Sequence, residues 1–340
     1  MLLFRQIEDY HFLADSITGI TFRWGKSIDD NPTYAPVPEL ADISISNRCS
    51  KACSFCYKDS TPDGKIMTFD EYCYVLDCLN SPEHGTVFQV AIGGGEPLEH
   101  PDFLKIVNET VERGIVFNFT TNGRLLTPEV FDLIRGKVGA MAISISSMLE
   151  WEEIKDALKG SEGIKVNIHY ILSKASIQEA IRLVNGVYNE MLKGVNAVIF
   201  LTYKPAGRGT LDWVLNNDIA VNELLKAIKS PKNTCKLGFD ACFVPILLHN
   251  HAVRKDIVDT CEGGFFSVYV DEHMRVSPCS FSGGKDTYSL KEYDFYDIWL
   301  NKLQPYRSTV RNRCKRICSV HDLCRGNCPY YPQITRCYQK

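Results

Sequence analysis

Three closely spaced cysteines near the N-terminus carry the clearest chemistry in the sequence. Cys49, Cys53 and Cys56 directly follow the apolar run at 41–46, and thiolates are ligands for iron and zinc. Three thiolates can bind three irons of a cubane cluster and leave the fourth iron open, whereas structural or electron-transfer clusters usually have all four irons bound by protein. The spacing therefore predicts a reactive iron–sulfur site, with a zinc site or unrelated core cysteines as the alternatives.

A larger group of cysteines lies in the C-terminal third of the sequence. Nine of the 14 cysteines lie between Cys235 and Cys337, and none lies between residues 79 and 234. The N-terminus lacks the basic stretch, apolar run and cleavage site of a signal peptide, so we expect a cytoplasmic protein with reduced cysteines. Metal or redox chemistry then explains the cysteines better than disulfides. Cys73 and Cys78 are exceptions, because they fall on a predicted helix and are expected to pack.

Composition and charge narrow the class of protein. Of the 340 residues, 45% are hydrophobic and 23% are charged, which is typical of a globular protein. A formal net charge of -3 gives no strong attraction to nucleic acid or anionic membranes, and no apolar run is long enough to span a bilayer. We therefore expect neither nucleic acid nor a membrane as a partner.

Between residues 41 and 230, short apolar runs alternate with longer amphipathic segments, as in βα units around a parallel sheet. The sequence predicts six strands, at 41–46, 87–92, 115–120, 140–145, 165–172 and 197–203. After Pro231 the pattern changes to Cys-, Gly- and aromatic-rich segments. We therefore expect a β-rich or irregular cap at 1–40, an α/β body at 41–234 and a small Cys-rich domain at 235–340.

Small and polar residues follow the predicted strands, at the edge where parallel α/β barrels place their chemistry. The cysteine loop follows the first strand, a Gly-Gly-Glu-Pro segment the second, and a Gly-Arg-Gly segment the sixth. Glycines permit close approach of a ligand, and a guanidinium group can bind a carboxylate. Ordinary turns are the alternative for several of these segments.

Together these motifs resemble the radical SAM superfamily, whose enzymes cleave S-adenosylmethionine (SAM). The C-x3-C-x2-C signature of that family matches Cys49, Cys53 and Cys56, and Phe55 fills the aromatic place before the third cysteine. The resemblance covers about residues 41–337. It implies an α/β fold with a partial (β/α)6 TIM-like barrel, a [4Fe–4S] cluster whose open iron binds SAM, and a 5'-deoxyadenosyl radical as the reactive species.

The resemblance also implies roles for residues after the strands. In the family's GGEP loop the backbone and the glutamate, here Glu96, receive the SAM amino group, while residues at later strand ends contact the ribose and carboxylate. Arg208 is expected to contact SAM or the substrate. The implied cofactor-binding residues are Phe55, Gly94, Gly95, Glu96, Pro97, Thr121, Asn122, Ser144, Ser146 and Arg208.

The C-terminal cysteines resemble the SPASM extension found on many radical SAM enzymes that modify peptides. Cys318, Cys324 and Cys328 keep its spacing, and Cys337 supplies its last cysteine. The sequence departs from the pattern in two places. The opening pair of cysteines is one residue too far apart, and Met274 stands in place of a glycine.

By this resemblance the extension would hold one or two auxiliary [4Fe–4S] clusters. The implied ligands are Cys261, Cys279 and Cys328 for the first cluster, and Cys314, Cys318, Cys324 and Cys337 for the second. Cys242, or failing it Cys235, is expected to complete the first set, and Cys242 is also a candidate catalytic residue. If neither does, the first cluster has an open iron for a substrate group. Zinc knuckles are the alternative.

The sequence thus predicts a radical SAM oxidoreductase that crosslinks or oxidises a ribosomally made peptide or a protein side chain. An electron donor such as flavodoxin or ferredoxin is the expected second partner. Three alternatives stay open, namely a sulfatase-maturing enzyme that makes formylglycine, a radical SAM enzyme acting on a small molecule, and a non-catalytic zinc-binding interaction module.

Overall fold

Alternating burial along the strands separates an outer face, packed under helices, from an inner face that lines an internal space. In β4 (Leu40–Ser46), Ala41, Ile43 and Ile45 lie in the hydrophobic core, while Asp42, between Ala41 and Ile43, faces a cavity. This period of two is what a strand imposes on its side chains. The computed structural model describes residues 2–81, 85–216, 218–255, 258–312, 324–325 and 328–334.

The main sheet confirms the six predicted strands, whose ends differ from the prediction by one or two residues. Besides β4 they are β7 (Gln89–Gly94), β8 (Val116–Thr121), β9 (Val138–Ile145), β10 (Val166–Leu172) and β11 (Ala197–Thr202). They pair in parallel and in sequence order, β4 to β7 and on to β11. The predicted α/β fold is therefore correct, and all carboxyl ends of these strands lie along one edge.

C-terminal residues extend this sheet at both ends. Next to β11 lies β12 (Lys236–Phe239), and next to β4 lies β13 (Ser267–Val270), each in parallel pairing. The antiparallel strands β14 (Arg275–Ser277) and β15 (Tyr288–Ser289) follow β13, so the sheet among the described residues has ten strands. Residues on both sides of position 235 thus share one sheet, and the predicted division into domains stays a prediction.

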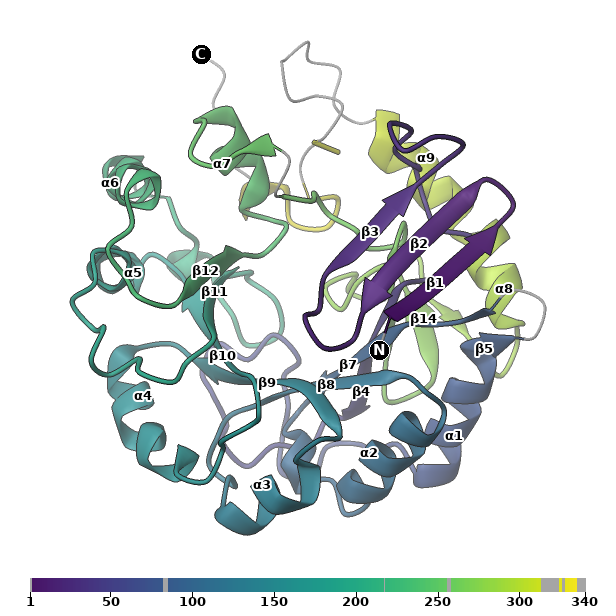
Figure 1. Ribbon diagram of the computed structural model, residues 1–340, viewed down its shortest axis with the longest axis horizontal. Helices are drawn as coiled ribbons and strands as arrows, with labels where there is room; N and C mark the ends of the chain where they lie inside the picture. Colours follow the sequence, from purple (N-terminus) through teal and green to yellow (C-terminus); the bar gives the residue numbers. More distant parts are fainter. Residues whose placement is uncertain are drawn as a thin grey trace.

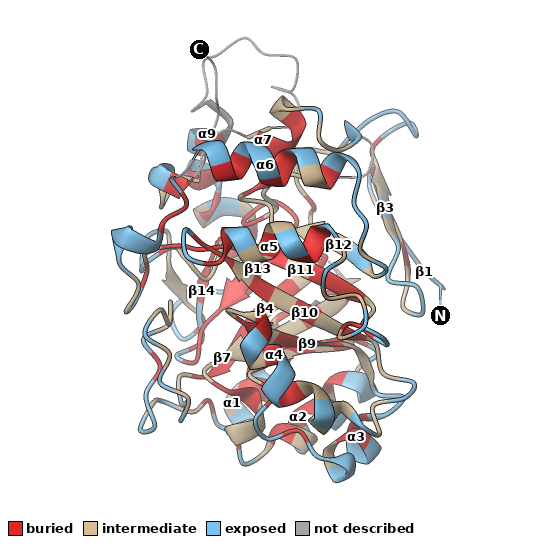
Figure 2. Ribbon diagram, turned by 90° about the vertical axis from the view of Figure 1, so that its left-hand side faces the viewer, coloured by how far each residue is buried: buried red, intermediate tan, exposed pale blue. Residues whose placement is uncertain are grey.

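Helices ring the outer face of the sheet (Figure 1). They include α1 (Phe69–Cys78), α2 (Phe103–Glu112), α3 (Pro128–Ile134), α4 (Met148–Ile154), α5 (Ile177–Val184) and α6 (Asp218–Lys229). A capping box fixes the start of α1, because Thr68 and Glu71 each accept a hydrogen bond from the other's backbone N–H. Buried residues, red in Figure 2, concentrate on the strands and on the helix faces turned toward them.

Shorter elements complete the described chain. They are the hairpin of β5 (Asn80–Ser81) and β6 (Gly85–Thr86), the 3-10 turns η1 (Pro97–Glu99), η2 (Lys155–Leu158), η3 (Leu211–Trp213) and η6 (Pro332–Ile334), the helices α7 (Val244–His249), α8 (Phe295–Asp297) and α9 (Gln304–Asn312), and the π-helical η5 (Ile298–Lys302). No helix among the described residues is long and apolar enough to cross a membrane.

The N-terminal segment, predicted to be a β-rich or irregular cap, contains a small sheet. Its antiparallel sheet consists of β1 (Leu2–Ile7), β2 (Tyr10–Asp15) and β3 (Thr21–Trp24). The inner face of β2 packs through Tyr10 and Phe12 against Phe265, Phe266 and Tyr306 of the C-terminal region. The cap therefore braces the same region that carries the second group of cysteines.

Candidate active site

The first three cysteines lie on a loop that leaves the carboxyl end of β4, where the sequence placed them. Backbone hydrogen bonds close this loop, since the Cys49 N–H donates to the Thr61 carbonyl (2.9 Å) and the Cys56 N–H to the Cys53 carbonyl (3.2 Å). The Ser60 N–H also points at the Cys56 sulfur, at 3.5 Å. All three thiols line a cavity of about 430 Å³, called here the barrel cavity. Burial raises the pKa of Cys49 and of Cys53.

Arg208 holds this loop from outside the barrel cavity. Its guanidinium donates to the carbonyls of Cys53 and Ser60, both at 2.9 Å, and to the Asp59 carboxylate at 2.8 Å. A side chain on Gly207 would come within 2.4 Å of the Cys56 carbonyl oxygen, so only glycine permits this approach. These contacts position the cysteines, and the predicted contact between Arg208 and SAM or substrate stays a prediction.

The Gly-Gly-Glu-Pro segment packs against the start of the cysteine loop. The Gly95 N–H donates to the Ser46 carbonyl and the Glu96 N–H to the Arg48 carbonyl, at 2.6 and 2.8 Å. An added Cβ on Gly95 would lie 1.9 Å from the Arg48 carbonyl oxygen. The close approach that Gly94 and Gly95 permit is therefore to the chain's own backbone. Both also line the barrel cavity, as does Gly93, where an added Cβ would meet open space.

Glu96 is a buried carboxylate, 1% exposed, held in one orientation. Thr121 Oγ1 and the Asn122 N–H both donate to it at 2.7 Å, and the Leu98 N–H donates at 3.1 Å. Burial raises its pKa despite these bonds. Pro97 is buried at the start of η1 and does not line the barrel cavity. Glu96, Thr121 and Asn122, all predicted to bind the cofactor, are thus joined by hydrogen bonds. The Asn122 Nδ2 atom also lies 4.0 Å from the Cys49 sulfur.

The remaining predicted residues divide into two groups. Phe55 and Ser144 line the barrel cavity, whereas Ser146 does not. Ser146 instead donates from its N–H (2.7 Å) and its hydroxyl (3.2 Å) to Glu150, which pairs with Lys51 of the cysteine loop at 3.1 Å. Ser146 is therefore linked to the loop through an ion pair.

Four C-terminal cysteines gather around a second cavity. Cys242, Cys261, Cys279 and Cys328, called here the C-terminal thiol cluster, all line a space of about 860 Å³, the C-terminal cavity. The Cys242 thiol donates to Cys328 and, with N–H groups of Tyr330 and Tyr331, lowers the pKa of Cys328 to about 6. Backbone N–H groups also point at Cys261 from Gly263 and at Cys279 from Phe281, the latter at 3.2 Å.

The other predicted ligands lie elsewhere. Cys324 packs beside Val244 and Leu248 and does not line the C-terminal cavity. Cys235 does line it, and its sulfur accepts a hydrogen bond from Asn233 at 3.7 Å. Cys314, Cys318 and Cys337 lie outside the described residues.

Five residues line both cavities and so form the wall between them, and the sequence had singled out none of them. They are Asp42, Lys204, Asp240, Ser280 and Phe281. Burial raises the pKa of Asp42 to about 7. Burial has the largest single effect on the pKa of Lys204 and lowers it, but Asp240, Cys242 and Cys279 together raise this pKa overall. The signals that could have found the first two were a charged residue within the apolar segment 41–46, for Asp42, and one directly after the apolar segment 197–203, for Lys204.

His169 was also missed. It lines the barrel cavity, and burial lowers its pKa to about 4. The imidazole is therefore neutral near pH 7, with Nδ1 3.4 Å from Thr120 Oγ1.

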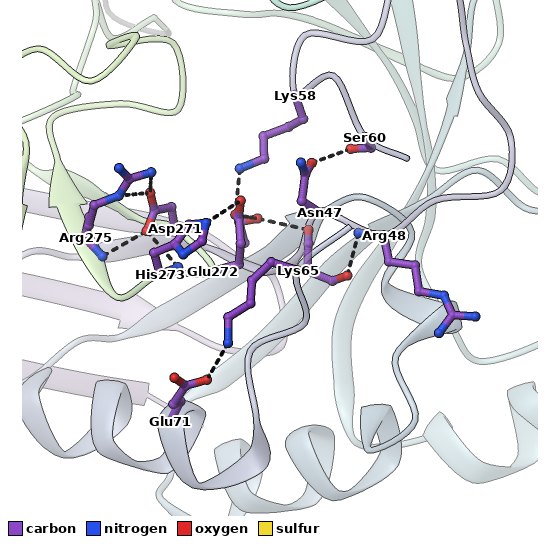
Figure 3. A network of polar contacts seen from close by, with 12 residues as sticks. Asn47, Arg48, Lys58, Ser60, Lys65, Glu71, Asp271, Glu272, His273 and Arg275 are labelled. Carbon is purple, nitrogen blue, oxygen red and sulfur yellow. Dashed lines mark hydrogen bonds and ion pairs between the residues drawn. The ribbon is translucent and has the colours of Figure 1, made fainter. Parts of the chain in front are cut away.

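A buried polar network joins the cysteine loop to the C-terminal hairpin (Figure 3). Lys58 donates to Glu272 and to the Tyr269 hydroxyl, both at 2.8 Å, and Ser44 donates to the same carboxylate. In the hairpin turn Met274 has a φ of 59°, a conformation that favours glycine. Met274 thus adopts the backbone shape of the glycine it replaces, and the departure noted in the sequence leaves the turn intact.

Thiolates are the protein ligands of an iron–sulfur cubane, and both groups of cysteines offer thiols at the wall of a cavity. Among the described residues, no three His, Cys, Asp or Glu side chains come together as ligands of a single metal ion. The thiolates of a cubane bind different irons and therefore stand further apart than the ligands of one ion. Backbone N–H groups directed at cysteine sulfurs are also the hydrogen bonds that tune such clusters.

A thiol loop over the carboxyl edge of a parallel sheet, with a fixed carboxylate beside it, defines an enzyme that holds a cluster next to a cationic cofactor. A family model described as "Radical SAM superfamily" matches residues 43–197. Mycofactocin maturase MftC of Mycobacterium ulcerans is 31% identical over 308 residues, an alignment that covers 84% of this chain and 81% of the relative. The chain therefore belongs to the radical SAM superfamily and is an enzyme, and membership implies SAM and a [4Fe–4S] cluster as cofactors.

Two further likenesses span most of the chain. AdoMet-dependent heme synthase of Methanosarcina barkeri is 24% identical over 339 residues, covering 85% of this chain and 90% of the relative. The crystal structure of Streptococcus suis SuiB bound to precursor peptide SuiA superposes with a TM-score of 0.71 at 14% identity, covering 98% of this chain and 97% of that one. The second likeness confirms the fold, including the predicted partial barrel with a C-terminal extension.

Proposed function

We propose that this enzyme uses a SAM-derived radical to crosslink or oxidise a ribosomally made peptide or a protein side chain. The observation that carries the proposal is the pair of adjoining cavities, each lined by thiols and separated by a wall of shared residues. Such a pair suits a net oxidation, in which one site starts the reaction and the other accepts an electron. The maturase relative supports a peptide as the substrate.

Cys49, Cys53 and Cys56 would hold the first cluster, which together with SAM supplies a 5'-deoxyadenosyl radical when bound. Glu96 is fixed in advance by three hydrogen bonds, so its carboxylate can receive the SAM ammonium without reorganising. Gly93, Asn122 and Ser144 offer further contacts around the barrel cavity. The imidazole of His169 is neutral, so it adds no positive charge of its own to the barrel cavity.

The C-terminal thiol cluster would hold an auxiliary [4Fe–4S] centre. Cys242 is the better candidate for its fourth ligand than Cys235, because Cys242 packs in the same apolar cluster as Cys328, whereas the Cys235 sulfur accepts a hydrogen bond from Asn233. This assignment makes Cys242 a ligand rather than a catalytic residue. We assign Cys324, with Cys314, Cys318 and Cys337, to a second auxiliary centre, as the resemblance implies, and a flavodoxin or ferredoxin of the cytoplasm as the electron donor.

Anaerobic reconstitution followed by incubation with SAM, dithionite and short peptides encoded beside the gene tests the proposal. We expect 5'-deoxyadenosine together with loss of two hydrogens from one peptide, measured by mass spectrometry. Protein that holds zinc in place of iron and releases no 5'-deoxyadenosine would overturn it and favour an interaction module.

A small-molecule substrate is the second candidate, and the heme synthase relative favours it. The same reconstituted enzyme incubated with a heme precursor separates the two. Modification of the precursor, with every peptide unchanged, would replace the peptide substrate and leave the radical chemistry in place.

A further inference from the structure

Lys204 places a buried positive charge in the wall between the two cavities. Its side chain is 6% exposed, and its ammonium donates to Asp240 Oδ2 at 2.9 Å and to the Thr202 carbonyl at 3.0 Å. The same nitrogen lies 4.3 Å from the centre of the Phe281 ring. A carboxylate, a carbonyl and an aromatic face are all partners that a cation prefers.

The charge lies beside the C-terminal thiol cluster. Asp240 precedes Cys242 by two residues, Phe281 follows Cys279 by two residues, and Lys204 acts electrostatically on the thiols of both cysteines. Thr202 Oγ1 donates to the other oxygen of Asp240 at 2.6 Å. The carboxylate is therefore held from both sides, and it holds the ammonium in turn.

The first three cysteines experience a different set of charges. Besides the neighbouring cysteines, the charged groups that act on Cys49 are Glu99 and Glu96, and those that act on Cys53 are Lys51 and Glu150. The barrel cavity thus has a lysine–carboxylate pair of its own, Lys51 with Glu150, whereas the thiols on which Lys204 acts belong to the C-terminal thiol cluster.

A purely structural role does not require a charge at this position. Removing an ammonium from water is costly, and an apolar side chain of similar volume often packs as well as a buried ion pair. The position of the ammonium, beside a site suited to a redox centre, is what distinguishes it from an ordinary packing residue.

We propose that Lys204 is a positioning residue for electron acceptance, which raises the reduction potential of the auxiliary centre held by the C-terminal thiol cluster. The inference rests on the auxiliary centre of the proposed function. Reduction adds one negative charge to such a centre, and a nearby cation in a low-dielectric wall stabilises the reduced form. Asp240 has the opposite effect and sets how much of the lysine's charge the centre experiences.

An EPR-monitored redox titration of the reconstituted full-length enzyme tests this without any substrate. Lys204→Met should make reduction of the auxiliary centre about tenfold less favourable, a shift of about 59 mV to more negative potential for one electron. Asp240→Asn should shift the midpoint in the opposite direction, and the double variant should return close to wild type. The SAM-binding cluster in the same sample should keep its midpoint in all three variants.

Lys302→Met is the matched control, because Lys302 also lies over an aromatic ring, 4.0 Å from the Tyr293 ring centre, and pairs with Asp297 away from both cavities. It should leave both midpoints unchanged. An unshifted auxiliary midpoint in Lys204→Met, or in Lys204→Gln if the Met variant fails to load iron, would overturn the inference while leaving the auxiliary centre intact. A wild-type enzyme with only one cluster would overturn the auxiliary centre itself, and this inference with it.

Discussion

The cysteine loop and the C-terminal thiol cluster hold their sulfurs in different ways. Cys49, Cys53 and Cys56 come from one loop of eight residues, closed by its own backbone hydrogen bonds and held by Arg208. The four sulfurs of the C-terminal thiol cluster come from separate segments that meet around the C-terminal cavity. The first site depends on local geometry, whereas the second depends on the packing of the whole C-terminal region.

That difference predicts which substitutions affect only one of the two thiol sites. A change at the C-terminal thiol cluster should leave the barrel strands and the cysteine loop intact, because the barrel core is built from other residues. Changes in the barrel cavity should affect SAM first. The predictions below follow this division, from the largest expected effect to the smallest.

The largest effect is expected for iron content. Cys261→Ala with Cys279→Ala removes two thiolates of the C-terminal thiol cluster and should lower the iron content by about four per chain, one cubane. Cys73→Ala with Cys78→Ala is the matched control, since both cysteines lie on α1. If the control loses as much iron as the C-terminal double variant, the iron loss cannot be assigned to the C-terminal thiol cluster.

An intermediate effect is expected at Glu96. Glu96→Gln keeps the shape of the side chain and removes the charge that would pair with the SAM ammonium, a contact of about 1.5 to 3 kcal/mol. SAM should bind roughly ten- to a hundredfold more weakly in anaerobic calorimetry, while the exposed Glu223→Gln binds it normally. Unchanged affinity in Glu96→Gln would assign the ammonium contact to another group.

Asp42 should make stability depend on pH. Its pKa is raised from 3.8 to about 7 in the folded chain, so the folded state binds the proton more tightly and loses stability as pH rises from about 4 to about 7. Asp42→Asn removes this loss and should stabilise the protein at pH 8, with little effect at pH 4. Denaturant unfolding at the two pH values measures it, with the exposed Asp63→Asn as control.

Equal unfolding free energies for wild type and Asp42→Asn at pH 8 would contradict the raised pKa. A stabilisation of the same size at both pH values would assign the effect to packing.

The smallest effect is expected at Met274, which occupies the hairpin-turn position where the SPASM pattern has a glycine. Both Met274→Gly and Met274→Ala lose the buried side chain, but only glycine adopts a φ of 59° without strain. The glycine variant should therefore be more stable than the alanine variant by roughly 1 kcal/mol. The reverse order, which is usual at ordinary backbone positions, would show that the turn rearranges.

The sequence predicted the strands and the cysteine loop because both depend on local patterns. The alternation in β4 and the spacing of Cys49, Cys53 and Cys56 are visible without any tertiary contact. Arg208 shows the limit of such reasoning, since its three partners lie about 150 residues earlier in the chain. Its contacts with the cysteine loop could not be inferred from the Gly-Arg-Gly segment alone.

The wall between the cavities could not be predicted for the same reason. Lys204 and Asp240 are 36 residues apart. Lys204 directly follows a predicted strand, and Asp240 precedes Cys242 by two residues, so neither local pattern indicates that the two side chains pair. The choice between Cys242 and Cys235 was likewise open, because it depends on which thiol reaches Cys328 in space. Sites assembled from distant segments require the structure.

One measurement tests most directly the claim that the two thiol sites have separate tasks. Wild type, Cys53→Ala and Cys279→Ala are each incubated anaerobically with SAM and dithionite, and 5'-deoxyadenosine is counted per chain. Wild type and Cys279→Ala should both release it, whereas Cys53→Ala should release none, because an iron of the SAM-binding cluster loses its ligand. Release by Cys53→Ala at the wild-type rate, or none by soluble Cys279→Ala with its first cluster intact, would contradict the account.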